Sequence, residues 1–96
     1  SDDVTLIDVR EPDEWAAGRA AGAIHVPLGD VPNRLADLPS ATNAVIICRS
    51  GGRSAQATAW LLDNGYACRN LSGGTQAYFD AGLPMEADGD AEPRVV

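Results

Sequence analysis

The sequence predicts an α/β domain built on a mainly parallel sheet. Short apolar runs rich in β-branched residues, over residues 4–9 and 44–47, have the length and composition of buried parallel strands. Stretches with helical spacing separate these runs, so strands and helices alternate along the chain. Right-handed crossovers between parallel strands then place helices against the sheet.

Composition limits the size of the protein and its partners. The chain has 96 residues, enough for one domain, and 7 basic against 14 acidic side chains give a net charge of −7. This charge disfavours nucleic acid and anionic membrane as partners. No apolar run approaches the ~20 residues of a membrane span. We find no signal peptide and expect a cytoplasmic protein.

Two charged residues end the first predicted strand. Asp8 and Arg10 stand at its carboxyl end, and Pro12 then suits the first position of a short helix that stops at Gly18. Ligands of open α/β sheets collect at the carboxyl ends of the strands. We expect Asp8 and Arg10 to pair with each other or with Glu14, and to support a ligand-binding loop from behind.

The later elements follow from helix boundaries and apolar spacing. A short helix is predicted within residues 29–38, and a longer one over residues 54–64 with Ser54 as its N-cap. A strand over residues 67–71 and a last helix ending at Gly82 follow, with Tyr78 in the core. We therefore expect a domain over residues 1–85 and an acidic, flexible tail or linker over residues 86–96.

The glycine-rich turn after the strand at residues 44–47 is the candidate active site. Its residues are Cys48, Arg49, Ser50, Gly51, Gly52, Arg53 and Ser54. A cysteine between a strand and a helix N-terminus faces unpaired amides and the positive end of the helix dipole, which favour the thiolate. Glycines let successive amides turn inward as an anion-binding nest, and arginines add forked donors. We expect a charged, accessible sulfur in an anion cradle.

The cysteine loop, CRSGGRS, resembles the active-site loop of the rhodanese (sulfurtransferase) family. Further pieces resemble that family in the right order: LIDVR (6–10) with Glu14, Trp15 and Gly18, GAIHVP (22–27), LSGG (71–74), Ala77 and GLP (82–84). The resemblance implies a three-layer α/β/α fold that here lacks the usual N-terminal strand and helix. It departs from the family at Arg19, where histidine is usual.

The resemblance also implies a reaction. Cys48 takes a sulfane sulfur from thiosulfate or another persulfide donor, and the Cys48 persulfide passes it to cyanide or to a thiol or protein acceptor. Substrate-binding roles fall to Arg49, Ser50, Gly51, Gly52, Arg53 and Ser54, and supporting roles to Asp8 and Arg10. We expect no cofactor.

Two other functions stay open. The chain could be a non-catalytic binding or sensory module of a larger protein, because a fold does not fix a function. It could also be a phosphatase or arsenate reductase on the same fold, whose loop has an arginine six positions after the cysteine. Here Ser54 holds that position and Arg53 comes one residue early, which disfavours a tetrahedral phosphoryl group.

Cys68 and His25 have structural explanations. Cys48 and Cys68 would lie near opposite ends of neighbouring parallel strands, too far apart for the ~7 Å between Cα atoms that a disulfide allows. Cys68 is expected as a buried or half-buried strand cysteine. His25 is the lone histidine among apolar neighbours, and no cysteine–histidine spacing indicates a metal site.

Overall fold

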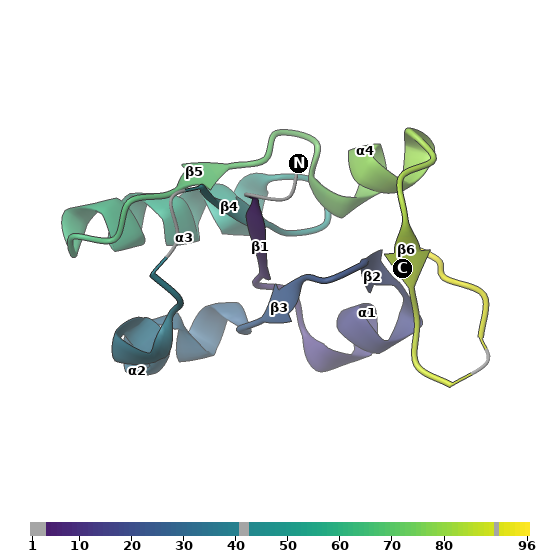
Figure 1. Ribbon diagram of the computed structural model, residues 1–96, viewed down its shortest axis with the longest axis horizontal. Helices are drawn as coiled ribbons and strands as arrows, with labels where there is room; N and C mark the ends of the chain where they lie inside the picture. The colour runs from purple at the N-terminus through teal and green to yellow at the C-terminus, as the bar shows by residue number, and fades with distance from the viewer. Residues whose placement is uncertain (1–3, 41–42, 90) are drawn as a thin grey trace.

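The computed structural model describes residues 4–40, 43–89 and 91–96, and has the predicted α/β architecture (Figure 1). Its elements are β1 (Thr5–Asp8), α1 (Pro12–Ala17), β2 (Arg19–Ala20), β3 (Ile24–His25), η1 (Leu28–Asp30), α2 (Val31–Arg34), η2 (Leu35–Asp37), β4 (Ala44–Ile47), α3 (Gly52–Asp63), β5 (Arg69–Asn70), α4 (Gly74–Asp80) and β6 (Met85–Glu86). Four strands form a parallel sheet in the order β3-β1-β4-β5. The predicted fold class is confirmed.

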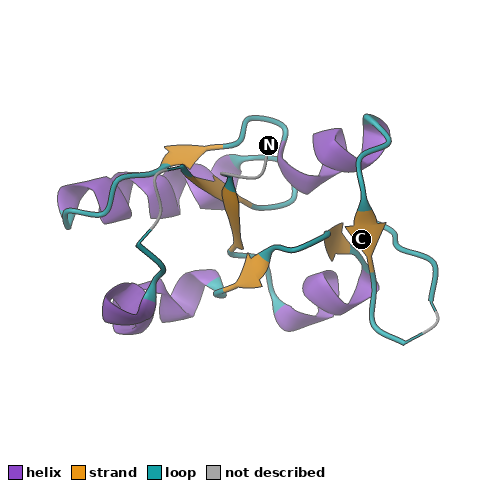
Figure 2. Cartoon of the chain, viewed as in Figure 1, coloured by secondary structure: helices purple, strands orange, loops and turns teal. Residues whose placement is uncertain are grey.

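Alternating side chains of the central strands divide between the two faces of the sheet. Ile7 of β1 and Ile46 of β4 point into the main core, where α3 and α2 cover them. In Figure 1, α2 and α3 lie to the left of β1, and α1 and α4 lie to the right. The buried cluster consists of Ile7, Val9, Val26, Val31, Ala44, Ile46, Cys48, Ala57 and Leu61. The result is a sheet between two layers of helices (Figure 2).

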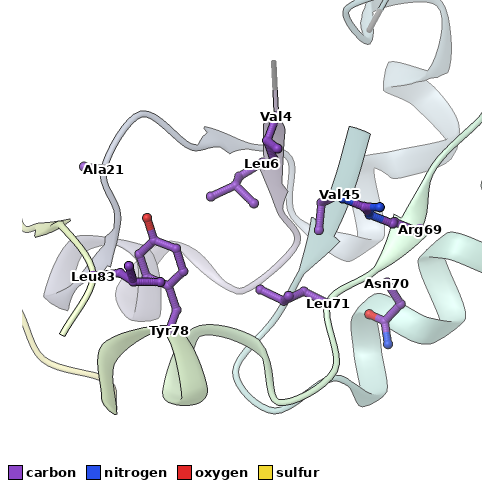
Figure 3. A pocket seen from close by; sticks show the side chains of 9 residues that line it. All are labelled: Val4, Leu6, Ala21, Val45, Arg69, Asn70, Leu71, Tyr78 and Leu83. Carbon is purple, nitrogen blue, oxygen red and sulfur yellow. The ribbon is translucent and has the colours of Figure 1, made fainter. Parts of the chain in front are cut away.

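The opposite face of the sheet is only partly covered. Leu6 of β1 and Val45 of β4 line a hollow of about 510 Å³ together with Leu71 and with Tyr78 of α4 (Figure 3). Tyr78 is half-buried at the edge of this hollow. The prediction that Tyr78 belongs to the packed core is therefore wrong, because the sheet face that it covers stays open.

Residues beyond the predicted domain boundary contact α1 and β2. β6 pairs antiparallel with β2, and Arg19 donates to the Asp88 carboxylate at 2.8 Å. Farther along, the Arg94 amide donates to the carbonyl of Ala17 at 3.0 Å. A Cβ on Gly18 would lie 2.2 Å from the Arg94 carbonyl oxygen, so this approach needs glycine. The acidic composition predicted none of these contacts, and the role of the segment as a tail or linker stays a prediction.

The carboxyl ends of the parallel strands share one edge of the sheet. Asp8 ends β1, Cys48 directly follows β4, and Asn70 ends β5. Because neighbouring parallel strands end side by side, these three residues are brought to the same edge.

None of the helices within residues 4–40, 43–89 and 91–96 has the length and apolar character that a membrane span requires.

Candidate active site

Cys48 lies beneath the loop that connects β4 to α3. The four residues of β4 are all buried, and Cys48 continues this buried run with 2% of its surface exposed. Arg49, Ser50 and Gly52, which follow it, are exposed. The prediction of an accessible sulfur is therefore wrong for this conformation. The cause is local, because the buried strand leads directly into Cys48, and Gly51 and Ser54 of the loop lie against its sulfur.

Two hydrogen-bond donors of the loop point at this sulfur. The Gly51 amide donates to Cys48 Sγ at 3.1 Å, and the Ser54 hydroxyl lies 3.2 Å from Sγ. Burial is the largest influence on the thiol and acts to raise its pKa. Hydrogen bonds from the Ser54 hydroxyl and from the amides of Ser54, Gly51 and Ser50 act in the opposite direction, and the pKa of Cys48 is lowered. The inward-facing amides agree with the anion cradle that the glycines predicted.

The start of α3 differs from the prediction. Gly51 is the N-cap, with φ of 115° in the left-handed region, and the helix begins at Gly52. Ser54 is fully buried inside the first turn, and its hydroxyl turns toward the sulfur and toward Asn70. Ser54 as N-cap is therefore wrong. The left-handed Gly51 places the N-cap three residues earlier than predicted, so the Ser54 hydroxyl lies inside the first turn and faces the cysteine.

Asn70 is a member of the site that the sequence did not single out. Its Oδ1 lies 2.5 Å from the Ser54 hydroxyl, and its Nδ2 donates to the Gly51 carbonyl at 3.3 Å. A hydroxyl has one proton, so Ser54 can donate either to Asn70 or to Cys48 at any moment. The signal that could have found Asn70 is its place at the carboxyl end of a strand neighbouring β4.

A second glycine turn holds the back of the cysteine loop. The amide of Thr75, at the start of α4, donates to the Cys48 carbonyl at 2.7 Å. A Cβ on Gly74 would lie 2.3 Å from that same carbonyl oxygen, and Gly74 has φ of 56°. A side chain there would be strained and would push the two loops apart. The Gly73-Gly74 turn is therefore part of the support of Cys48.

The two arginines of the loop differ in their partners. Arg53 is held by Glu14 of α1 through two hydrogen bonds of 2.6 and 2.8 Å. Arg49 is exposed, and its Nε donates to the backbone carbonyl of Val96 at 3.1 Å. Arg53 thus faces a carboxylate of its own chain, which the spacing of the loop residues could not indicate.

Asp8 and Arg10 form the ion pair that the sequence predicted. Both are buried, and Arg10 Nη2 lies 2.8 Å from Asp8 Oδ2. The same Nη2 donates to the Gly18 carbonyl at 2.7 Å, and Nη1 donates to the carbonyl of Glu14 at 3.4 Å. Arg10 therefore contacts the third residue of α1 and the C-cap that follows the helix. The same helix carries the partner of Arg53. The support that Arg10 gives to the cysteine loop runs through that helix.

The remaining candidate residues have structural surroundings. His25 stacks on Trp15 with ring centroids 4.6 Å apart, and its Nε2 lies 2.7 Å from the Arg10 carbonyl oxygen. Cys68 is half-buried and, like Cys48, forms no disulfide. Across residues 4–40, 43–89 and 91–96, no group of three or more histidine, cysteine or acidic side chains could hold a metal ion.

Comparison with known proteins identifies the family. The model of the rhodanese-like domain matches residues 1–81. The chain belongs to the rhodanese-like domain family. A sulfurtransferase of Allochromatium vinosum is 42% identical over 88 residues, which cover 91% of this chain and 82% of the relative.

Two further rhodanese-like relatives extend this similarity. Thiosulfate sulfurtransferase 16 of Arabidopsis thaliana, a chloroplast protein, is 36% identical over 94 residues, with 84% of this chain and 78% of the relative covered. The crystal structure of a rhodanese-related protein from Thermoplasma volcanium superposes with a TM-score of 0.84 at 30% identity. That match covers 91% of this chain and 87% of the other. The rhodanese-like fold is therefore shown in both sequence and structure.

Proposed function

We propose that this rhodanese-like domain is a sulfurtransferase that carries sulfane sulfur on Cys48. The donor is thiosulfate or a persulfide, and the acceptor is cyanide or a thiol. The observation that carries the proposal is the pair of donors on Cys48 Sγ, the Gly51 amide at 3.1 Å and the Ser54 hydroxyl at 3.2 Å. They favour the thiolate, which is the nucleophilic form of cysteine. Relatives named as sulfurtransferases support the same kind of chemistry.

The reaction has two substitutions at sulfur. The Cys48 thiolate attacks the outer sulfur of thiosulfate, the S–S bond of the donor breaks, and its electron pair leaves on sulfite. Cyanide or a thiolate then attacks the outer sulfur of the Cys48 persulfide, and the bonding pair returns to Cys48 as thiolate. Each step conserves charge and needs no cofactor. Cys48 Sγ carries the negative charge in the thiolate, and the transferred outer sulfur carries it in the persulfide.

The loop residues receive roles in this proposal. The amides from Arg49 to Ser54 hold the anionic sulfur, as Gly51 does for Sγ in the structure. Arg49, which is exposed and follows Cys48 directly, attracts the anionic donor. Arg53 is ion-paired with Glu14, so its charge at the loop is compensated. Asp8 and Arg10 position α1 from behind the loop.

One observation favours a second candidate, a binding or sensory module without sulfur transfer. Cys48 is 2% exposed, so a donor reaches the sulfur only when the covering loop admits it. A domain whose loop never opens would bind partners without turnover. The test below separates the two.

Sulfur loading of Cys48 decides between transfer and binding. The domain is reduced, freed of reductant and incubated with thiosulfate, and its intact mass is measured. We expect one added sulfur atom on the wild type and none on Cys48→Ser, followed by thiocyanate release when cyanide is added. Cys68→Ser is the matched control and loads like the wild type. A wild type that stays unloaded with thiosulfate and with a hydropersulfide would overturn the proposal in favour of the module.

A further inference from the structure

The ion pair between Glu14 and Arg53 compensates the positive charge of one of the two loop arginines. The two parallel hydrogen bonds, at 2.6 and 2.8 Å, form a fork between carboxylate and guanidinium. The Glu14 side chain is 13% exposed and that of Arg53 is 35% exposed. Arg53 therefore reaches the loop with its charge already compensated.

The position of Glu14 is fixed by other contacts. Its Oε1 also accepts the Glu11 amide at 3.0 Å, which closes a capping box at the start of α1. Arg10 holds the carbonyls of Glu14 and Gly18, one turn apart on the same helix. A donor that competed for Arg53 would have to displace a carboxylate that the helix holds in place.

The pair is charged throughout the physiological pH range. The hydrogen bond from Arg53 is the largest influence on Glu14, whose pKa is lowered to about 2. The hydrogen bond to Glu14 in turn raises the pKa of Arg53, and the negative charge of Glu11 acts in the same direction. Glu14 thus stays a fixed counter-charge.

The charges near the loop then add up to a weak attraction for anions. Among the described residues, Asp8 and Arg10 neutralise each other in the core, and Glu14 neutralises Arg53. Arg49 donates through Nε to the main-chain oxygen of Val96 and forms no salt bridge with an acidic side chain among the described residues. The reacting sulfur is itself an anion. With Arg53 compensated by Glu14, these surroundings suit a donor of low charge better than a dianion.

We propose that Glu14 is a specificity-determining residue that makes this site favour singly charged sulfane-sulfur donors over dianionic thiosulfate. The inference rests on the proposed sulfur transfer and names the class of donor for the same site. Donors of this class are hydropersulfides and thiosulfonates. Glu14 acts through Arg53, so its effect is electrostatic and scales with the charge of the donor.

Two donors that differ by one charge test this inference. Thiosulfate carries two negative charges, and methanethiosulfonate replaces one anionic oxygen with a methyl group. In both, the Cys48 thiolate attacks the outer sulfur and the S–S electron pair leaves, as sulfite from the first donor and as methanesulfinate from the second. The measured quantity is the ratio of kcat/KM for thiosulfate to kcat/KM for methanethiosulfonate, with cyanide as acceptor.

Substitution of Glu14 is expected to move this ratio toward thiosulfate. Glu14→Gln keeps an oxygen acceptor for the Glu11 amide and removes the counter-charge, and we expect the ratio to rise about three- to tenfold at low salt. Asp13→Asn is the matched control. It removes one negative charge from an exposed neighbour on the same helix, and we expect less than about a twofold change.

Two variants of Arg53 complete the test. Arg53→Gln uncovers the Glu14 charge, so the ratio is expected to fall below that of the wild type. The double variant Glu14→Gln with Arg53→Gln is neutral again and is expected to return the ratio to within about twofold of the wild type. Thermal unfolding midpoints check that each variant is folded.

The outcomes separate this inference from the proposed function. If the wild type loads sulfur and Glu14→Gln leaves the donor ratio unchanged, Glu14 does not set specificity, although sulfur transfer stands. An equal shift in Asp13→Asn would also overturn the inference, because it would show a general field effect. A wild type that accepts sulfur from neither donor would overturn the proposed function, and this inference with it.

Discussion

The two cysteines of this domain flank neighbouring strands, and their surroundings shift the pKa values of the two thiols in opposite directions. Cys48 follows the carboxyl end of β4, and Cys68 precedes the amino end of β5. Burial acts to raise the pKa of both thiols. For Cys68, burial raises the pKa of the thiol. For Cys48 the Ser54 hydroxyl and three amides outweigh burial, and the pKa is lowered.

The difference follows from the hydrogen-bond donors at each sulfur, because Gly51 and Ser54 surround Cys48 at the carboxyl end of its strand. At the carboxyl edge of a parallel sheet, loops lead into helix N-termini and their free amides face inward. Cys68 lies at the other edge and lines a surface hollow of about 180 Å³ with Asn43, Ala44, Ala67 and Arg69. Cys68 is the more accessible thiol to an added reagent, whereas Cys48 is the more easily ionised one.

Competitive alkylation is the most direct test of the difference in reactivity between Cys48 and Cys68. With limiting iodoacetamide near pH 7, we expect Cys48 to react about tenfold faster than Cys68, because the thiolate fraction governs the rate. Peptide mass spectrometry after short labelling times gives the ratio, with Cys48→Ser and Cys68→Ser identifying each site. Faster labelling of Cys68 would show that the covered sulfur of Cys48 is closed to small reagents.

The same comparison shows what could be predicted from the sequence. The β-branched runs predicted the parallel sheet, because a buried strand leaves a local record in composition. The glycines and helix start beside Cys48 predicted its inward amides for the same reason. The Asp8–Arg10 pair could also be predicted, since these two charges are only two positions apart in the sequence.

Contacts between segments that are distant in the sequence could not be predicted from local composition or spacing. Asn70 reaches Ser54 from another strand, and Glu14 reaches Arg53 across 39 positions of the chain. The depth of Cys48 depends on Gly74 and Thr75, which come from a later turn. Sequence spacing fixes neighbours along one element, but only the packed fold decides which elements meet.

Loss of the Ser54 hydroxyl is expected to shift the pKa of Cys48 in the direction of that of Cys68. Ser54→Ala removes the strongest hydrogen bond that opposes burial, so the pKa of Cys48 rises and the alkylation rate near pH 7 falls about three- to tenfold. The midpoint of the rate against pH moves to higher pH. A fall in rate without a shift of that midpoint would mean that the substitution blocks access instead.

Thr58→Val is the matched control for this variant. The Thr58 hydroxyl also belongs to α3 and donates to the Ser54 carbonyl at 2.7 Å, with no contact to the sulfur. We expect its alkylation midpoint to match that of the wild type. A shift as large as in Ser54→Ala would assign the effect to the helix rather than to the hydroxyl.

The smallest expected effect is a difference in the pH dependence of stability. The folded state lowers the pKa of Cys48, so the contribution of its thiolate is present at high pH and is lost as pH falls through the folded pKa. The folded state raises the pKa of Cys68, so the contribution of its thiol is present below the unfolded pKa and is lost as pH rises. Between pH 7 and 10 the two cysteines therefore change the free energy of unfolding in opposite directions.

We expect the change in unfolding free energy between pH 7 and 10 to be most negative for Cys48→Ser, intermediate for the wild type and least negative for Cys68→Ser. Successive steps should be of the order of 1 kcal/mol or less. Urea unfolding at pH 7 and at pH 10 measures this change for the three proteins. The opposite order of the three proteins would mean that the loop amides do not hold a charged sulfur.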